Sequence, residues 1–252
     1  HHRSSAASDV YKRQGFSDWD ALLADPAVDA VIIATPPAPR FDLARRALEA
    51  GKHLLLEKPI ALHADQAREL QRLSLARGLS VAVDYEYRAV PLFMQAARLL
   101  QAGAVGTPWL VKLDWLMGSR ADPQRGWNWY AQADQGGGVI GALGTHAVDM
   151  LAWLIGPLGA VQALNGVSIK QRPHPDGGLA AVDAPDVSLL QTVAHWQGRQ
   201  DLPVPAQVSL SSVSRNGRGF CLDVVGSSGS LMLSSTNPVS YTHLRAHETR
   251  FY

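Results

Sequence analysis

Short apolar runs alternate with helical patterns along the first third of the chain. The run over 30–34 is entirely apolar and rich in β-branched residues, which predicts a strand buried on both faces. Helices over 41–50 and 64–77 and strands over 52–57 and 79–83 follow, with a glycine after each helix as its stop signal. This alternation is typical of crossover connections in a parallel sheet, so it predicts the second half of a dinucleotide-binding fold.

A different pattern begins after a helix predicted over 91–101. One helix over 145–155 interrupts a series of isolated strands, which we expect over 109–116, 161–169, 187–196, 206–213, 220–225 and 230–233. We therefore predict the fold class as α/β plus α+β. A partial Rossmann domain over 15–103 precedes an α+β domain over 104–238 for substrate binding and oligomerisation, whose open sheet is largely antiparallel.

The two ends of the chain lack the periodicity of either domain. We interpret 1–14 and 239–252 as non-native tails. No strand with a G-x-G-x-x-G turn precedes Gly15. We therefore expect a fragment whose first βαβ unit and pyrophosphate cradle lie outside it.

Composition argues against several classes of function. The formal charge is +1, and because the tails together carry +3, the middle has a net charge of −2, which argues against nucleic-acid binding. No apolar run approaches the roughly 20 residues of a membrane span, so we expect no membrane contact and a cytoplasmic location. Four of the nine histidines lie in the tails, so their number indicates no metal site. The single cysteine, Cys221, predicts a buried thiol on a strand.

Two motifs carry groups that are suited to proton transfer. Glu57-Lys58-Pro59 follows an apolar strand, and Gly136–Gly138 leads into Gly144-Thr145-His146 and a helix. Oxidising an alcohol requires a general base near neutral pH, and a lysine in a cleft beside a positive nicotinamide ring would have a lowered pKa. A histidine at a helix start is kept neutral by the helix dipole and could hydrogen-bond the reacting oxygen. The plainer alternatives are a solvated lysine and a histidine that caps its helix.

These motifs, together with Thr35-Pro36-Pro37 after the first strand, resemble the Gfo/Idh/MocA family of nicotinamide-dependent enzymes, which act mostly on sugars and polyols. The resemblance runs from about Gly15 to Leu233. It implies NAD or NADP as cofactor and Lys58 and His146 as catalytic residues, with a peptide before Pro59 that is often cis. The residues expected beside the cofactor are Thr35, Pro36, Pro37, Glu57 and Lys58.

Three further residues are assigned to the substrate: Arg88, Asp149 and Trp127. Arg88 closes the acidic and aromatic segment 84–88, which matches a subgroup of the family. Asp149 shares a helix face with His146 and Trp153, whereas Val148, Leu151 and Ile155 are expected to form the buried face. Trp127 could offer its ring to a sugar, although packing in the interior is an open alternative.

Ala142 departs from the family pattern. Many members carry an aspartate four residues before the histidine, so no Asp-His relay is implied here. We hypothesise an NAD(P)-dependent oxidoreductase that interconverts an alcohol and a carbonyl on a sugar, cyclitol or related polyol, and that forms a homo-oligomer when full length. The alternatives are a non-catalytic member that binds a sugar or nucleotide, and a fragment that is inert because the phosphate-binding loop is absent.

Overall fold

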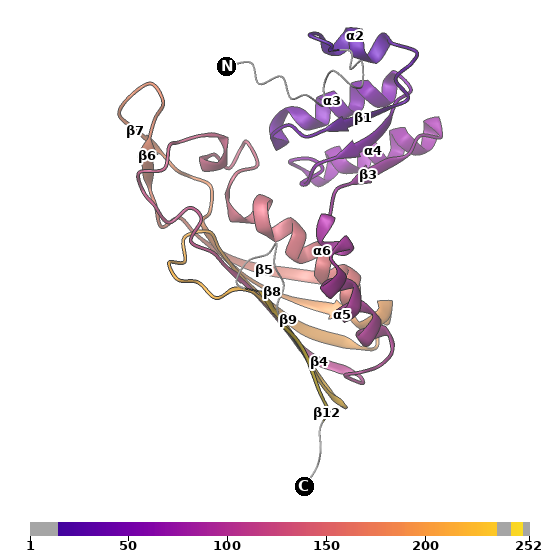
Figure 1. Ribbon diagram of the computed structural model, residues 1–252, viewed down its shortest axis with the longest axis vertical. Helices are drawn as coiled ribbons and strands as arrows, with labels where there is room; N and C mark the ends of the chain where they lie inside the picture. The colour runs from indigo at the N-terminus through magenta and orange to yellow at the C-terminus, as the bar shows by residue number, and fades with distance from the viewer. Residues whose placement is uncertain (1–14, 236–242, 249–252) are drawn as a thin grey trace, which may run out of the picture.

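The computed structural model describes residues 15–235 and 243–248, which form two lobes (Figure 1). The predicted tail over 1–14 lies outside the described residues, as do 239–242 and 249–252 of the second predicted tail. Among the described residues, no helix is both long enough and apolar enough to cross a bilayer.

The first lobe is built on three parallel strands in the described part of the chain, in the order β1 (Ala30–Ile33), β2 (His53–Leu56) and β3 (Val81–Val83). The helices of this lobe are α2 (Trp19–Ala24), α3 (Pro37–Glu49) and α4 (Ala64–Arg77). Val31 and Ile33 are buried with the apolar side chains of α3 and α4, whereas Ile32 is 71% exposed. The prediction that the first strand is buried on both faces is therefore wrong, because the described helices cover only the face of Val31 and Ile33.

Helix boundaries in this lobe follow from proline and glycine. Helix α3 begins at Pro37, four residues earlier than predicted, because the fixed φ of proline suits the first turn of a helix. Helix α4 has the predicted bounds, and Gly78 ends it in a left-handed conformation with φ of 65°.

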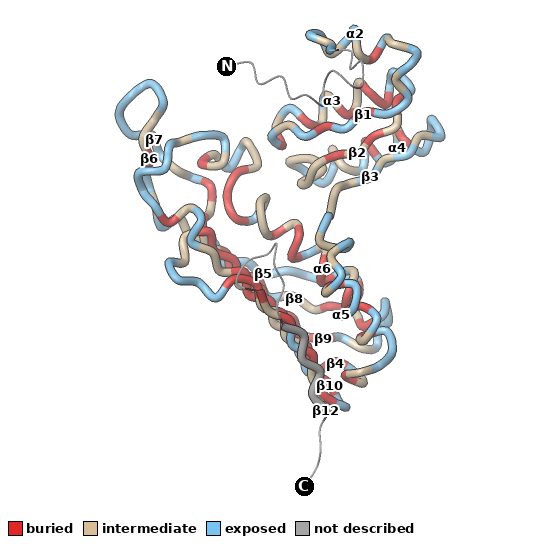
Figure 2. The backbone as a smooth tube through the Cα atoms, viewed as in Figure 1, coloured by how far each residue is buried: buried red, intermediate tan, exposed pale blue. Residues whose placement is uncertain are grey.

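The second lobe is a sheet with two helices on one face. Its strands run in the order β12-β11-β10-β4-β9-β8-β5, and every neighbouring pair except β4 and β9 is antiparallel. Helices α5 (Pro91–Gln101) and α6 (Thr145–Leu154) cover one face, and Figure 2 shows buried residues where they meet the sheet. The strands are β4 (Pro108–Leu116), β5 (Leu158–Gly166), β8 (Val187–His195), β9 (Pro203–Ser211), β10 (Gly219–Gly226), β11 (Gly229–Ser235) and β12 (His243–Glu248). The predicted fold class is confirmed.

The extent of the second lobe differs from the predicted domain 104–238 at both ends. Helix α5 packs in the core of this lobe through Phe93 and Leu100, so the lobe begins before residue 104. The backbone of 243–248 continues the sheet as β12, beyond residue 238. The strand predicted over 161–169 is observed earlier, as β5 over Leu158–Gly166. It ends before residue 168 because the backbone N–H groups of Ser168 and Ile169 donate to the carboxylate of Asp186 and not to a neighbouring strand.

A two-stranded ribbon was not predicted. It consists of β6 (Gln171–Pro173) and β7 (Leu179–Ala181) and projects from the sheet (Figure 1). Short turns complete the description: η1 (Glu86–Ala89), η2 (Trp129–Ala131), the π-turn η3 (Ile140–Gly144) and η4 (Trp196–Gly198). Cys221 lies on β10 as predicted, but its side chain is only half-buried.

Candidate active site

Lys58 connects the two lobes. It lies two residues after the end of β2, and its peptide bond to Pro59 is cis, as the resemblance implied. Its Nζ donates a hydrogen bond of 3.1 Å to the carbonyl oxygen of Ala142 in the second lobe. Burial lowers the pKa of Lys58, and the negative charges of Glu86 and Glu57 oppose this shift. The amine is therefore more easily deprotonated than that of an exposed lysine, as a general base requires.

A π-turn precedes His146. The backbone N–H of Thr145 bonds the carbonyl of Ile140, five residues back, and the Thr145 hydroxyl bonds the carbonyl of Gly141 at 3.0 Å. Helix α6 therefore continues from an existing turn, and no side chain caps it. His146 therefore does not cap the helix, and α6 has no free start at which a helix dipole would act on the imidazole. Single π-turns within helices are frequent at functional sites.

The imidazole of His146 is enclosed by aromatic rings. Its exposed fraction is 3%, and the ring centroids of Tyr87, Tyr85 and Trp115 lie 4.7, 5.8 and 6.1 Å away. Burial first, and then the positive charge of Lys58, lower the pKa of His146 to about 3. The imidazole is therefore neutral at physiological pH and can donate one hydrogen bond. The two predicted catalytic residues are close enough to interact electrostatically.

A cavity of about 340 Å³ opens where β1 and β2 end. Ligands bind at the carboxyl ends of parallel strands in folds of this kind. All five residues predicted to contact the cofactor line this cavity: Thr35, Pro36, Pro37, Glu57 and Lys58. The hydroxyl of Thr35 is buried and has no hydrogen-bond partner within the described part of the chain, so it is free to bond a ligand.

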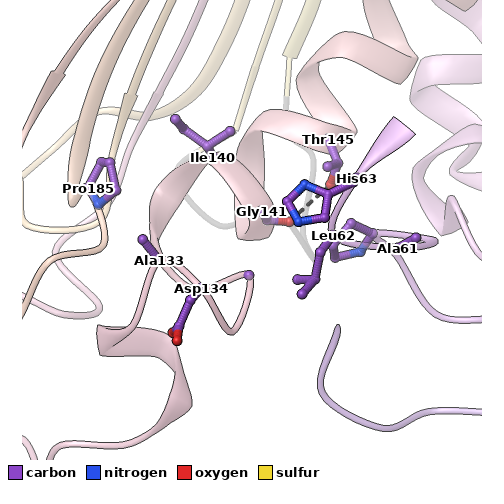
Figure 3. Close-up of a pocket in the computed structure, with 12 residues that line it drawn as sticks. Ala61, Leu62, His63, Ala133, Asp134, Ile140, Gly141, Thr145 and Pro185 are labelled. Carbon is purple, nitrogen blue, oxygen red and sulfur yellow. Dashed lines mark hydrogen bonds between the residues drawn. The ribbon is translucent and has the colours of Figure 1, made fainter. Parts of the chain in front are cut away.

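Gly136 shapes the wall of this cavity. Its φ is +76°, and a Cβ at this position would lie 2.7 Å from Cδ2 of Leu62 and 2.9 Å from Cβ of Pro37. Only glycine combines this backbone conformation with such a close approach. Gly136 also lines a neighbouring cavity of about 320 Å³, which Figure 3 shows between the loop of His63 and the turn of Thr145.

Arg40 is a residue to which the sequence analysis gave no role. Its side chain is 2% exposed, and its guanidinium donates hydrogen bonds to the carbonyl groups of Thr35, Glu57 and Pro59. These carbonyls lie in the segments that follow β1 and β2, so Arg40 holds together the segments that carry Lys58 and the residues predicted to contact the cofactor. The signal was present in the sequence, because Arg40 falls on the same helical stripe as Ala44.

Arg88 and Asp149, both predicted to contact substrate, bond to each other. Two hydrogen bonds of 2.8 and 2.6 Å join the Arg88 guanidinium to the Asp149 carboxylate, and the Arg88 side chain remains 48% exposed. The Arg88 guanidinium also lies 5.8 Å from the centre of the Trp153 ring. The predicted buried face of the helix needs correction, because Val148 is 42% exposed whereas Ala147 and Met150 are buried.

Trp127 lies apart from the residues that line the cavity. Its indole N–H donates to the carbonyl of Ala181 at 2.8 Å, and its ring centroid is 5.0 Å from that of His174. This half-buried tryptophan thus packs against the β6–β7 ribbon. Trp129 lines the cavity in its place and is 37% exposed, so it can present an aromatic face to a ligand.

Glu86 was missed by the sequence analysis. Its Oε1 atom lies 3.8 Å from Nε2 of His146, and its carboxylate also acts on Lys58. The residue was part of the segment 84–88 from which Arg88 was chosen. The sequence Tyr85-Glu86-Tyr87 has no pattern that distinguishes a glutamate of a functional site from a glutamate on the protein surface.

Comparisons with known proteins give a consistent result. Residues 1–85 match the oxidoreductase family with an NAD-binding Rossmann fold, and residues 93–232 match the Gfo/Idh/MocA C-terminal domain. An uncharacterized oxidoreductase of Synechocystis is 43% identical over 231 residues, which are 90% of this chain and 60% of that protein. The levoglucosan dehydrogenase of Pseudarthrobacter phenanthrenivorans is 31% identical over 181 residues, 70% of this chain and 46% of that protein.

Solved structures agree with the sequence relatives. A levoglucosan dehydrogenase in complex with NADH and L-sorbose superposes with a TM-score of 0.79 and 25% identity, over 92% of this chain and 64% of that one. The chain thus spans less than two thirds of the length of these three relatives. From its family matches, its fold and its relatives, we conclude that the chain belongs to the Gfo/Idh/MocA family of oxidoreductases.

Proposed function

We propose that the full-length protein is an NAD(P)-dependent oxidoreductase that interconverts an alcohol and a carbonyl on a sugar, cyclitol or related polyol. The observation that carries this proposal is that Lys58 lines the cavity at the ends of β1 and β2 and lies close enough to the buried His146 to lower its pKa. The relatives include a levoglucosan dehydrogenase and a scyllo-inositol 2-dehydrogenase, which supports this substrate class.

The cavity residues fit the nicotinamide half of the cofactor. The unpaired hydroxyl of Thr35 can bond a ribose or amide group, and Pro36 and Pro37 hold the turn at the start of α3 in one conformation. When bound, the nicotinamide supplies the acceptor or donor of hydride. The same cavity contains Glu57 and Lys58, so the reacting carbon would lie within reach of the amine.

The proton chemistry follows from the two pKa shifts. Lys58, whose pKa is lowered by burial, takes the hydroxyl proton during oxidation and returns it during reduction. His146 remains neutral, because its pKa is about 3, and donates a hydrogen bond to the reacting oxygen without adding a second positive charge. The Arg88–Asp149 pair holds one side of α6 in place, and Trp129 offers an aromatic surface at the cavity.

The open face of the sheet supports the proposal of a homo-oligomer. Strand β5 is exposed along most of its length, and the exposed apolar side chains on the face away from the helices include Leu164, Leu189 and Met232. Exposed apolar surface of this kind is common where subunits associate. Light scattering coupled to size-exclusion chromatography would measure the oligomeric state.

The functional proposal is tested with the full-length protein. A panel of sugars and cyclitols is assayed with NAD⁺ and NADP⁺ by the absorbance of the reduced cofactor. We expect Lys58→Met to lose at least about 100-fold in kcat, the lower end of the range for general acid–base catalysis, with NADH binding retained. The matched control Lys170→Met removes an exposed lysine and should retain activity. Full activity of Lys58→Met would overturn the proposal, and NADH binding without any turnover would favour the non-catalytic alternative.

A further inference from the structure

Glu86 lies between the buried site and the solvent. It is the first residue of η1, which links β3 of the first lobe to α5 of the second. The Glu86 side chain is 53% exposed, whereas that of His146 is 4% exposed, and their nearest charged atoms are 3.8 Å apart. The carboxylate therefore contacts water on one side and the catalytic histidine on the other.

The negative charge of Glu86 acts on the amine of Lys58. Among the negative charges that act on the Lys58 amine, that of Glu86 is the strongest and exceeds that of the adjacent residue Glu57. The titratable groups that interact with Glu86 include Lys58, His146, Asp84, Glu57 and Tyr87. Lys58 is the base in the proposed function, so the strongest partner of Glu86 is the group that must exchange a proton.

A proton on Lys58 needs an exit in each catalytic cycle. The amine lines the cavity, where a bound cofactor and substrate would cover it, and its hydrogen-bond acceptor is the backbone carbonyl of Ala142. A carbonyl accepts a hydrogen bond but does not hold a proton at neutral pH. The enclosed His146 does not offer a route either, because its imidazole stays neutral. The carboxylate of Glu86 can both accept a proton and release it to water.

We propose that Glu86 is a proton-relay residue that carries the proton between Lys58 and the solvent, an inference that rests on the proposed function. In oxidation, the substrate O–H bond breaks and its proton moves to Nζ of Lys58, while the C–H hydride leaves to the oxidised nicotinamide and a C=O bond forms. The proton then moves from Nζ through water to the Glu86 carboxylate, and from there to bulk water. Reduction runs the same steps in reverse.

The pKa shifts of the two groups suit this transfer. Burial raises the pKa of Glu86 and lowers the pKa of Lys58, so the two values approach each other. A smaller difference between donor and acceptor makes proton transfer in both directions faster. Because half of the Glu86 side chain is in water, an isosteric amide at this position is compatible with the fold.

The first test compares Glu86→Gln with the matched control Asp84→Asn, which removes a charge two residues away on the same linker. We expect Glu86→Gln to lower kcat by about 10-fold to 100-fold, below the full contribution of an acid–base group. Added acetate or imidazole should restore much of this rate by carrying the proton instead. Asp84→Asn should retain the rate, and acetate should not accelerate it. An unchanged kcat in Glu86→Gln would overturn the relay.

A second test does not depend on activity. Lys58 is acetylated with a limiting amount of acetic anhydride at a series of pH values, and the modified peptide is quantified by mass spectrometry. Loss of the Glu86 charge should move the midpoint of Lys58 labelling to lower pH in Glu86→Gln, but not in Asp84→Asn. Identical midpoints in all three proteins would overturn the coupling. If Lys58→Met is fully active, the proposed function fails, whereas an inactive Lys58→Met with an unaltered Glu86→Gln refutes the relay alone.

Discussion

Replacing Arg40 with methionine should lower the free energy of unfolding by about 3 kcal/mol, since buried carbonyls that lose their donors cost about 1–3 kcal/mol each. The methionine side chain keeps most of the apolar contacts of the arginine stem within the lobe. The substitution therefore removes mainly the donors to the carbonyl groups of Thr35, Glu57 and Pro59.

The magnitude comes from two opposing contributions. Three unpaired carbonyls would sum to roughly 3–9 kcal/mol if each bore the full cost. The guanidinium itself is costly to bury, because its acceptors are uncharged and burial lowers its pKa, so removal of the charge recovers part of the loss. The lower end of the range is therefore expected.

The assay is urea-induced unfolding of the full-length protein, with the free energy obtained by linear extrapolation. Arg45→Met is the matched control, since Arg45 lies on the same helix but forms exposed ion pairs with Asp42 and Glu49. Exposed pairs contribute little, so the control should unfold like the wild type. The reasoning is refuted if Arg40→Met loses less than about 1 kcal/mol or no more than the control.

Two further predictions concern the site. The wild type should lose stability as pH falls from 6.5 towards 3, by up to about 1.4 kcal/mol per pH unit, because His146 binds a proton in the unfolded state but stays neutral in the folded state. The variant His146→Leu should lack this component of the pH dependence. Equal slopes of stability against pH for both proteins, measured by thermal melts at several pH values, would contradict the prediction. Gly136→Ala should weaken NADH binding, measured by the fluorescence of the nucleotide, because the new methyl group would lie 2.7 Å from Leu62 and 2.9 Å from Pro37. The control Gly126→Ala places its methyl group in open space and should bind NADH normally; similar binding by both variants would count against the proposed cavity.

Sequence reasoning succeeded where local chemistry determines the structure. The bounds of α4 and α5 were predicted in full, because Gly78 stops one helix and Pro91 starts the other. Lys58 reaches the turn before His146, so the two motifs lie close together in the fold.

Other features depend on contacts between distant segments. The π-turn before α6 has no sequence signature, because a shift of the hydrogen-bond partner by one residue leaves the composition unchanged. The exposure of Val148 follows from how α6 is rotated against the sheet, which helical periodicity alone did not determine. Helical periodicity can place Arg40 on the buried stripe of α3, but the roles of Arg40 and Glu86 are set by partners on other segments, which the sequence pattern does not identify.

The central claim is that Lys58 and His146 form one proton-transfer site. A pH titration by nuclear magnetic resonance, with labelled lysine and histidine side chains in the full-length protein, tests it most directly. The claim predicts that His146 stays neutral until the pH approaches 3 and that Lys58 titrates below the ordinary lysine value of 10.5. Titration of His146 near 6.5 together with Lys58 near 10.5 would contradict it.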